Sequence, residues 1–369
     1  MNLCSSVSGV VIFMLACSHS FAEKPVQVIA NGAVVNPRQP QSAVDEDGGI
    51  HVAFGGDDGI YYCGSADKGQ SFSRPVKIAV VSKLALGMRR GPRIVANREN
   101  IVVTAISHES GDLSAWRSTD NGKSWQGPVK VNDSPRHARE GLHAMASSAT
   151  RKLCCTWLDL RNGKTQLFCS ISDDFGKTWN KNRSIYASPD GSICECCHPA
   201  VTFDAEGNIY AMWRNSLKGS RDLYFAVSRN GGTTFGDGVK LGKGSWQLNA
   251  CPMDGGYLAV DPTGKMTTVW RRGKEIYITG KDPLDEQLVG TGEQPWATAT
   301  NDGTYLVWLS NRNGKLWLAT PGDGKPKKIA DNASDPVVTA PVTGKGPVVI
   351  VWESRSDQTK SIMAQVVHE

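Results

Sequence analysis

Four short segments of the chain repeat one pattern, Ser-x-Asp-x-Gly-x-x-aromatic, and this repetition restricts the fold more than any other feature. Each segment begins about fifty residues after the previous one. The four are Ser65 to Phe72, Ser118 to Trp125, Ser172 to Trp179 and Ser228 to Phe235, the last with Asn230 in the aspartate position. Self-similarity at a fixed period indicates a repeat architecture in which each copy supplies one structural unit.

The residue types in this pattern are typical of a hairpin turn. Serine and aspartate side chains accept hydrogen bonds from the backbone N–H groups of a turn, and glycine permits a positive φ. The aromatic residue is expected to pack beneath the turn. Asparagine makes similar turn contacts, so we expect the fourth turn to form as well. The pattern predicts strands joined by hairpins, with negligible helix.

A second repeat, which reads as strand, turn and strand, precedes each hairpin turn. It runs from Ala43 to Phe54, and comparable copies end at Trp213, Trp270, Trp308 and Trp352. Trp157 ends an equivalent strand, and we expect these five tryptophans to pack in the core. The first strand of each copy is predicted to start at Gln41, Pro92, Leu142, His198, Pro252, Pro295 and Pro336.

The hairpin pattern resembles the Asp box of the sialidase-like (BNR-repeat) β-propellers, and the resemblance covers nearly all of residues 23–369. It implies an all-β propeller forming a single domain, with Asp boxes on blade edges away from the ligand face. The count of strand starts predicts seven blades, although the family's catalytic members have six, which is the alternative. We expect Val26 to Ala30 to supply the outer strand of the last blade and close the ring, which removes exposed edges.

Residues 1–22 are predicted to be a signal peptide for export. Val7 to Ala16 is an apolar run too short to span a bilayer, and Ser20-Phe21-Ala22 offers a cleavage site. The chain is therefore expected to be periplasmic or extracellular, with a lipid anchor on Cys17 as an alternative. No other segment is predicted to cross a membrane. The net charge of +5 is scattered along the chain, which does not favour a nucleic-acid partner.

In a propeller, the starts of the innermost strands converge at one end of the central channel. Sialidase chemistry, which the resemblance implies, requires an arginine cluster for a carboxylate, a tyrosine nucleophile helped by a glutamate, and an aspartate acid/base. The catalytic candidates are Arg93, Glu140, Asp254 and Tyr257. The candidates for binding a glycan or another small ligand are Arg139, Arg214, Arg271, Trp246 and Trp296. Ordinary ion pairs and core packing are the alternative roles for these arginines and tryptophans.

The same end of the channel is predicted to gather sulfur and imidazole ligands. The candidate metal ligands are Cys194, Cys196, Cys197, His198, Cys251, Met253 and His143. Thiolate, thioether and imidazole together favour a soft ion, with copper first and zinc as its competitor. The alternative is a disulfide between Cys251 and one of the three clustered cysteines, because export leads to an oxidising compartment. A disulfide or core burial is also expected for Cys154, Cys155 and Cys169.

The sequence therefore leaves three functions open. The first is a sialidase-like glycoside hydrolase, and the second is a copper-binding propeller. The third is a non-catalytic module that binds a glycan or a protein, because this type of fold does not by itself imply catalysis.

Overall fold

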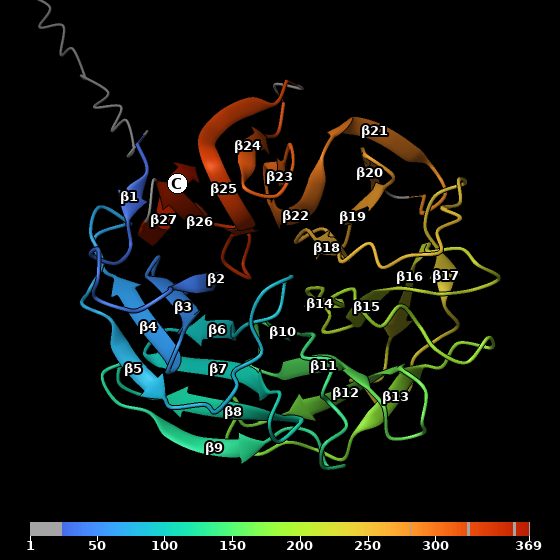
Figure 1. Ribbon diagram of the computed structural model, residues 1–369, viewed down its shortest axis with the longest axis horizontal. Helices are drawn as coiled ribbons and strands as arrows, with labels where there is room; N and C mark the ends of the chain where they lie inside the picture. The colour runs from blue at the N-terminus through green and yellow to red at the C-terminus, as the bar shows by residue number, and fades with distance from the viewer. Residues whose placement is uncertain (1–23, 281, 323–324, 357–358, 369) are drawn as a thin grey trace, which may run out of the picture.

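The protein consists of antiparallel β-sheets arranged around a common centre (Figure 1). The computed structural model describes residues 24–280, 282–322, 325–356 and 359–368. These residues contain no α-helix, and so no helix that could cross a membrane. The predicted signal peptide and Cys17 lie outside the described residues.

Five sheets have four strands each, in chain order. They consist of β2 (Arg38–Val44), β3 (Ile50–Gly56), β4 (Gly59–Ser65) and β5 (Val76–Ala79); β6 (Arg93–Asn97), β7 (Asn100–Ser107), β8 (Asp112–Ser118) and β9 (Gln126–Lys130); β10 (His143–Ser147), β11 (Leu153–Asp159), β12 (Gln166–Ser172) and β13 (Arg183–Tyr186); β14 (Ala200–Phe203), β15 (Ile209–Arg214), β16 (Leu223–Ser228) and β17 (Val239–Lys240); β18 (Gly256–Val260), β19 (Met266–Arg272), β20 (Glu275–Thr279) and β21 (Glu286–Thr291).

The sixth sheet has seven strands in the order β1-β27-β26-β25-β24-β23-β22. Its strands are β22 (Glu293–Thr300), β23 (Gly303–Leu309), β24 (Gly314–Ala319), β25 (Lys327–Thr339), β26 (Val348–Ser356), β27 (Thr359–His368) and β1 (Val26–Gln27). The long strand β25 pairs with β24 up to Ala333 and with β26 from Ala333 onward. Pro336, predicted as a strand start, lies inside β25 where the register with β26 shifts. A proline cannot donate to the ladder, which favours an irregular position there.

The innermost strands surround the channel and pack against one another in sequence. β2 contacts β6, and the contacts continue through β10, β14, β18 and β22 to β25, which in turn contacts β2. The second strands of the sheets carry the predicted core tryptophans, and these are buried: Trp157, Trp213, Trp270, Trp308 and Trp352. At the outer edge of the sixth sheet, Val26 pairs with Ala364, so the two ends of the described chain lie side by side (Figure 1).

The four Asp-box turns each join the third and fourth strands of a sheet, and they share one hydrogen-bond pattern. In every turn the glycine N–H donates to the serine Oγ at 2.8 to 2.9 Å. The Oδ1 of the aspartate, or of Asn230, accepts the N–H of the residue four positions later at 2.8 to 3.0 Å. The four glycines have φ between +77° and +88°, which explains the need for glycine.

The asparagine turn provides a test of the Asp-box geometry. In the complete turn, Asp174 Oδ2 accepts the hydroxyl of Thr178 at 2.6 Å, whereas Asn230 must donate to the equivalent Thr234. Because bonds to a charged acceptor are stronger, Asn230→Asp is expected to raise stability by on the order of 0.5 kcal/mol, and Asp174→Asn to lower it similarly. Calorimetry should show melting temperatures that move in opposite directions by roughly 1 °C. Shifts of the same sign in both variants would contradict this account.

Candidate functional site

The channel mouth, the end of the ring where the innermost strands start, is filled by a buried polar network. Arg89, in the loop between β5 and β6, donates to the carbonyl oxygens of Gln294 at 2.7 Å and Pro336 at 2.8 Å. Gln294 and Asp335 are joined by two hydrogen bonds of 2.9 and 3.0 Å. One loop thus ties its sheet to the starts of β22 and the inner part of β25.

Glu353 of β26 belongs to the same network. Its Oε1 accepts the backbone N–H of Gln39 at 2.8 Å, and the Gln39 side chain donates to Asp335 at 2.7 Å. Glu353 is almost fully buried, and burial, followed by the negative charge of Asp335, raises its pKa to about 7. The carboxyl group therefore holds its proton more tightly in the folded protein than in an unfolded chain.

Arg93, predicted as a catalytic arginine, is buried at the start of β6. Its terminal nitrogens donate to the carbonyl oxygens of Arg89, Gly91 and Pro92. Backbone oxygens of its own loop thus occupy the guanidinium face that would otherwise bind a substrate carboxylate. Through these bonds Arg93 stabilises the loop that carries Arg89.

Arg214 and Asp254 are engaged in the same way. The Arg214 guanidinium donates to the carbonyl oxygens of Asp254, Arg221 and Arg271. The Asp254 carboxylate, which is fully buried, accepts the Gln294 N–H at 2.8 Å and lies 3.2 Å from Arg271 Nε. Burial raises the pKa of Asp254, while the charge of Arg271 opposes this shift. Asp254 is thus an ion-pair partner of Arg271 within the mouth.

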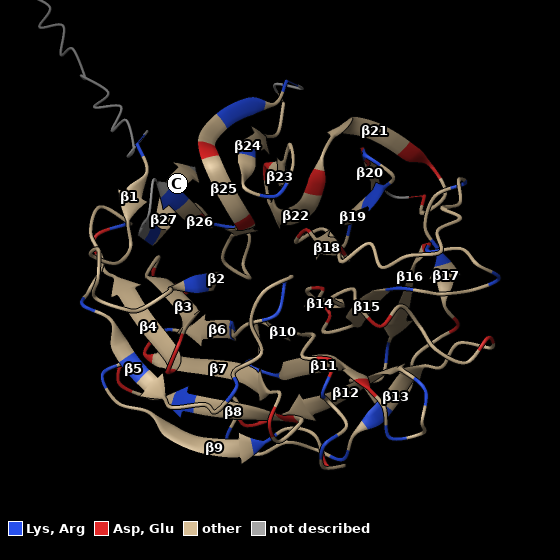
Figure 2. Ribbon diagram, viewed as in Figure 1, with Lys and Arg blue, Asp and Glu red and all other residues tan. Residues whose placement is uncertain are grey.

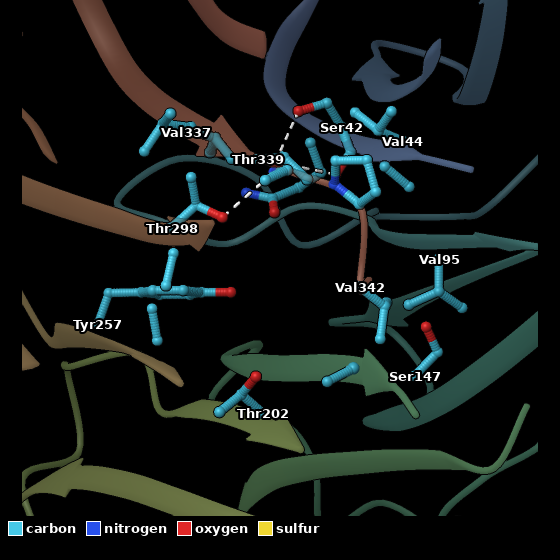
Figure 3. Close-up of a pocket in the computed structure, with 18 of the residues that line it drawn as sticks. Ser42, Val44, Val95, Ser147, Thr202, Tyr257, Thr298, Val337, Thr339 and Val342 are labelled. Carbon is cyan, nitrogen blue, oxygen red and sulfur yellow. Dashed lines mark hydrogen bonds between the residues drawn. The ribbon is translucent and has the colours of Figure 1, made fainter. Parts of the chain in front are cut away.

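Trp296 separates this network from a cavity farther along the channel. The Arg89 guanidinium lies 5.1 Å from the Trp296 ring centre, and Tyr257 stacks on that ring at 4.0 Å. The cavity has a volume of about 150 Å³ and is lined by residues from all seven innermost strands. Figure 3 shows the Tyr257 hydroxyl pointing into it. Burial raises the pKa of Tyr257 to about 12, so the phenol keeps its proton at neutral pH.

The other predicted ligand-binding residues lie around the rim of the mouth. Trp246 is half-buried, and its ring lies against the guanidinium groups of Arg214 and Arg271, at 5.3 and 5.4 Å. Arg139 is exposed, and Glu140 is half-buried next to it. Burial, then the nearby charge of exposed Glu195, raises the pKa of Glu140. Glu140 and Tyr257 are not brought into one pocket, because the cavity lining includes only Tyr257.

Three cysteines at the mouth form a compact group, which we call the thiol cluster: Cys194, Cys196 and Cys197. Their sulfur atoms all lie within 4.8 Å of one another, and all three side chains are buried. The Sγ of Cys194 is 3.1 Å from that of Cys197 and 3.6 Å from that of Cys196. Hydrogen bonds with these two thiols, aided by the charge of Arg214, lower the pKa of Cys194 to about 3.

Two further sulfur-bearing side chains come from the loop between β17 and β18. Met253 packs against the thiol cluster, and the interaction with Cys196 raises the pKa of the Cys251 thiol to about 11. Unlike the cluster, Cys251 is exposed to solvent. The fold therefore brings together three of the cysteines and the methionine that the sequence suggested as soft-metal ligands, with Cys251 on the loop that carries the methionine.

Arg214 holds the two cysteine-bearing loops beside each other. Its backbone carbonyl accepts the N–H of Cys194 at 3.0 Å, while its side chain donates to the carbonyl of Asp254. Gly255 allows the close approach, because a Cβ at this position would lie 2.2 Å from the carbonyl oxygen of His198. The geometry of the thiol cluster thus depends on contacts between sheets that are distant in sequence.

The two histidines do not join the thiols, which corrects the predicted ligand set. His198 is buried, accepts the Gly255 N–H at its Nδ1 and stacks on Trp296 at 5.7 Å. His143 is fully buried, and its Nε2 is hydrogen-bonded to Thr104. Burial, with nearby arginine charges, lowers the pKa of both imidazoles. They face the arginine network, and only the three cysteines form the group within 4.8 Å in the described chain.

The predicted disulfides are absent among the described residues. All eight described cysteines are free, including Cys251 and the pair Cys154 and Cys169, which interact on β11 and β12. Cys154, Cys155 and Cys169 are buried, in agreement with the core burial that was the alternative to a disulfide, and Cys63 is buried as well.

Sequence reasoning missed several residues of the mouth. Arg89 is the main example, since nothing in its neighbourhood distinguishes it from the adjacent Arg90. Arg312 donates to the Met253 carbonyl at 3.0 Å and pairs with Glu293 at 3.5 Å. Both arginines lie in loops without a repeated pattern. In the sequence, only Gly87 and Gly91, which adopt positive φ in the structure, could have indicated an unusual loop around Arg89.

Comparison with known proteins agrees with this architecture. A family model described as a BNR repeat-like domain matches residues 101–269. An alpha-L-arabinanase from Penicillium chrysogenum, solved with arabinobiose, has 13% sequence identity, with 93% of this chain and 98% of that chain covered, at a TM-score of 0.56. A Dyadobacter fermentans protein of unknown function has 16% identity, 93% and 99% coverage and a TM-score of 0.53. No curated protein sequence gives a significant match.

Residues 101–269 resemble a BNR repeat-like domain, and the chain has the fold of these solved structures. An alpha-L-arabinofuranosidase from Fusarium graminearum, solved with an iminosugar inhibitor, has the same fold, with 14% identity, 93% and 97% coverage and a TM-score of 0.51. At these identities the likeness concerns the fold alone. Charges of both signs are spread around the sheets of this protein (Figure 2).

The buried Glu353 gives this propeller a predicted pH dependence. Because its pKa is about 7 in the folded protein against 4.5 as the reference, its contribution to stability is complete below pH 4.5 and is lost as the pH rises through 7. Between these limits, the free energy of unfolding of the wild type should fall by about 3 kcal/mol relative to Glu353→Gln. Urea unfolding from pH 4.5 to 8 measures this difference. Parallel pH profiles for the two proteins would show that Glu353 ionises normally.

Proposed function

We propose that the protein is an exported β-propeller that binds a soft metal ion, foremost Cu(I), at the thiol cluster. The observation that carries the proposal is the position of Cys194, Cys196 and Cys197, three buried sulfur ligands within 4.8 Å of one another. Thiolate and thioether ligands select Cu(I) over harder ions. The predicted signal peptide in residues 1–22 supports export.

The ligand number favours Cu(I) over Zn²⁺. A structural zinc site is closed by four protein ligands, whereas the buried group offers three. Met253 adds a thioether beside the cluster, which suits a soft ion. Glu140 interacts electrostatically with Cys196, and Glu195 with Cys251. The negative charges of these two carboxylates favour a cation at this rim.

We also infer that the sheets form a closed ring of seven blades. In this arrangement the inner part of β25, with β26, β27 and β1, makes the seventh blade. The contact of β25 with β2 and the pairing of β1 with β27 support it. A closed ring would hold the thiol cluster and the Cys251 loop in a fixed relation, because neither loop could move without its blade.

Metal content provides the direct test. The protein, reduced and loaded with Cu(I) without oxygen, is expected to retain one copper per chain after desalting. Cys194→Ser and Cys197→Ser should each weaken binding by at least about 100-fold, which is the upper range for loss of an outer-shell partner. Competition with a coloured Cu(I) chelator measures the affinities.

A matched control is Cys63→Ala. Cys63 is also a buried thiol, but it lies on β4 in another sheet, so its loss should leave copper binding unchanged. Absence of copper from the wild-type protein would refute the proposal, as would equal loss of copper in Cys63→Ala.

Carbohydrate hydrolysis is the second candidate, and one observation favours it. Glu140 has a raised pKa beside the second carboxylate of Glu195, and glycoside hydrolases use two carboxyl groups of which one stays protonated. The arabinanase and arabinofuranosidase relatives share the fold.

This second candidate makes its own prediction. If the rim hydrolyses glycosides, Glu140→Gln should lower kcat on a chromogenic arabinoside or sialoside by about 10²- to 10⁴-fold, as expected for loss of a general acid. Glu206→Gln is the control, since Glu206 is exposed in the turn between β14 and β15. No release of sugar by the wild-type protein, or equal rates in both variants, would exclude hydrolysis by this pair.

A further inference from the structure

The cysteines around the thiol cluster differ in their access to solvent. Cys194, Cys196 and Cys197 are 1%, 7% and 2% exposed, whereas Cys251 is exposed. Met253, two residues after Cys251, nevertheless packs against the cluster, and the Cys251 thiol interacts with that of Cys196. The loop that carries Cys251 therefore extends from the solvent to the buried thiol cluster.

The surroundings of Cys251 contain further soft ligands. Met253 packs against the thiol cluster, and its carbonyl accepts Arg312 Nη2 at 3.0 Å. The other terminal nitrogen of Arg312 contacts the sulfur of Met88, a side chain that is 42% exposed. Two neutral thioethers and one exposed thiol thus lie on the solvent side of the cluster. A site that only stabilises the fold would have no need of such a rim, because structural metal sites are closed.

We infer that Cys251 is the exchange ligand of the site, through which Cu(I) passes between the thiol cluster and the thiol or thioether of a metal-carrying partner. This inference rests on the proposed function of the cluster. The three buried cysteines would retain the ion, while Cys251 would bind it during arrival and departure. Loss of Cys251 should therefore affect the rate of exchange and leave the equilibrium affinity nearly unchanged.

The exchange balances without an oxidant or reductant. As the bond between Cu(I) and Cys251 breaks, a bond forms between Cu(I) and a thiolate of the acceptor. The acceptor thiol releases its proton when it binds the ion, and the departing cysteine takes up a proton. Copper remains Cu(I) throughout, and no sulfur is oxidised.

Hydrogen bonds from Arg214 and Arg271 fix the backbone just after Cys251. Arg271 Nη2 donates to the carbonyl of Pro252 at 2.8 Å, and Arg214 donates to that of Asp254. The loop is therefore fixed on the C-terminal side of Cys251. Residues 249 to 251 are exposed, so the cysteine lies where a fixed loop meets an accessible one.

The experiment compares copper transfer from the wild type and Cys251→Ser. Each full-length protein is reduced, loaded with one Cu(I), and mixed in a stopped-flow instrument with excess glutathione or bathocuproine disulfonate. The variant is expected to retain one copper with an affinity within about threefold of the wild type, and to release it to glutathione at least about tenfold more slowly. Cys251→Met, which restores a soft ligand, should recover part of the rate.

The possible results separate this inference from the proposed function. A wild-type protein that binds no copper refutes both. If both proteins bind copper and release it at equal rates, the thiol cluster stands as a metal site and the role of Cys251 is overturned. If Cys251→Ser loses copper altogether, Cys251 is a permanent fourth ligand, and its role as an exchange ligand is overturned as well. The Cys63→Ala protein, treated in parallel, should transfer copper at the wild-type rate.

Discussion

Packing of the innermost strands against one another determines which loops meet at the channel mouth. Each of these strands contacts the next around the channel, from β2 to β25 and back to β2. Because all of them run in the same direction, the loops that precede them meet at one end. The segment before β14 carries the thiol cluster, and the segment before β18 carries Cys251 and Met253. Two loops about fifty residues apart become neighbours for this reason alone.

The same convergence brings several arginines together at the mouth, and carbonyl oxygens and carboxylates of the protein compensate their positive charge. Arg89, Arg93 and Arg214 are buried, and their terminal guanidinium nitrogens donate to backbone carbonyl oxygens of the surrounding loops. Burying a charge is costly unless hydrogen bonds and an opposite charge compensate it, and Asp254 with Arg271 provides such a pair. The arginines thus stabilise the mouth instead of exposing a carboxylate-binding surface. The thiol of Cys251 remains exposed at the rim of the mouth.

The sequence predicted the local features of the fold well and the contacts between sheets poorly. The Asp boxes and the second-strand tryptophans follow from patterns within single hairpins, and they occur as expected. The convergence of Cys194 to Cys197 with Cys251 followed from repeat counting. The direction of each side chain did not, because it depends on strand register: His198 faces Trp296, and His143 faces Thr104, both away from the thiols. Arg89 acts through distant carbonyl groups that no local pattern reveals.

X-ray absorption at the copper edge tests the central claim most directly, because it identifies the atoms bound to the metal. The geometry of the thiol cluster predicts that the Cu(I)-loaded protein has a first shell of three sulfur atoms and no imidazole nitrogen. A shell containing histidine nitrogen, or only oxygen and nitrogen, would contradict the account and place the metal elsewhere in the protein.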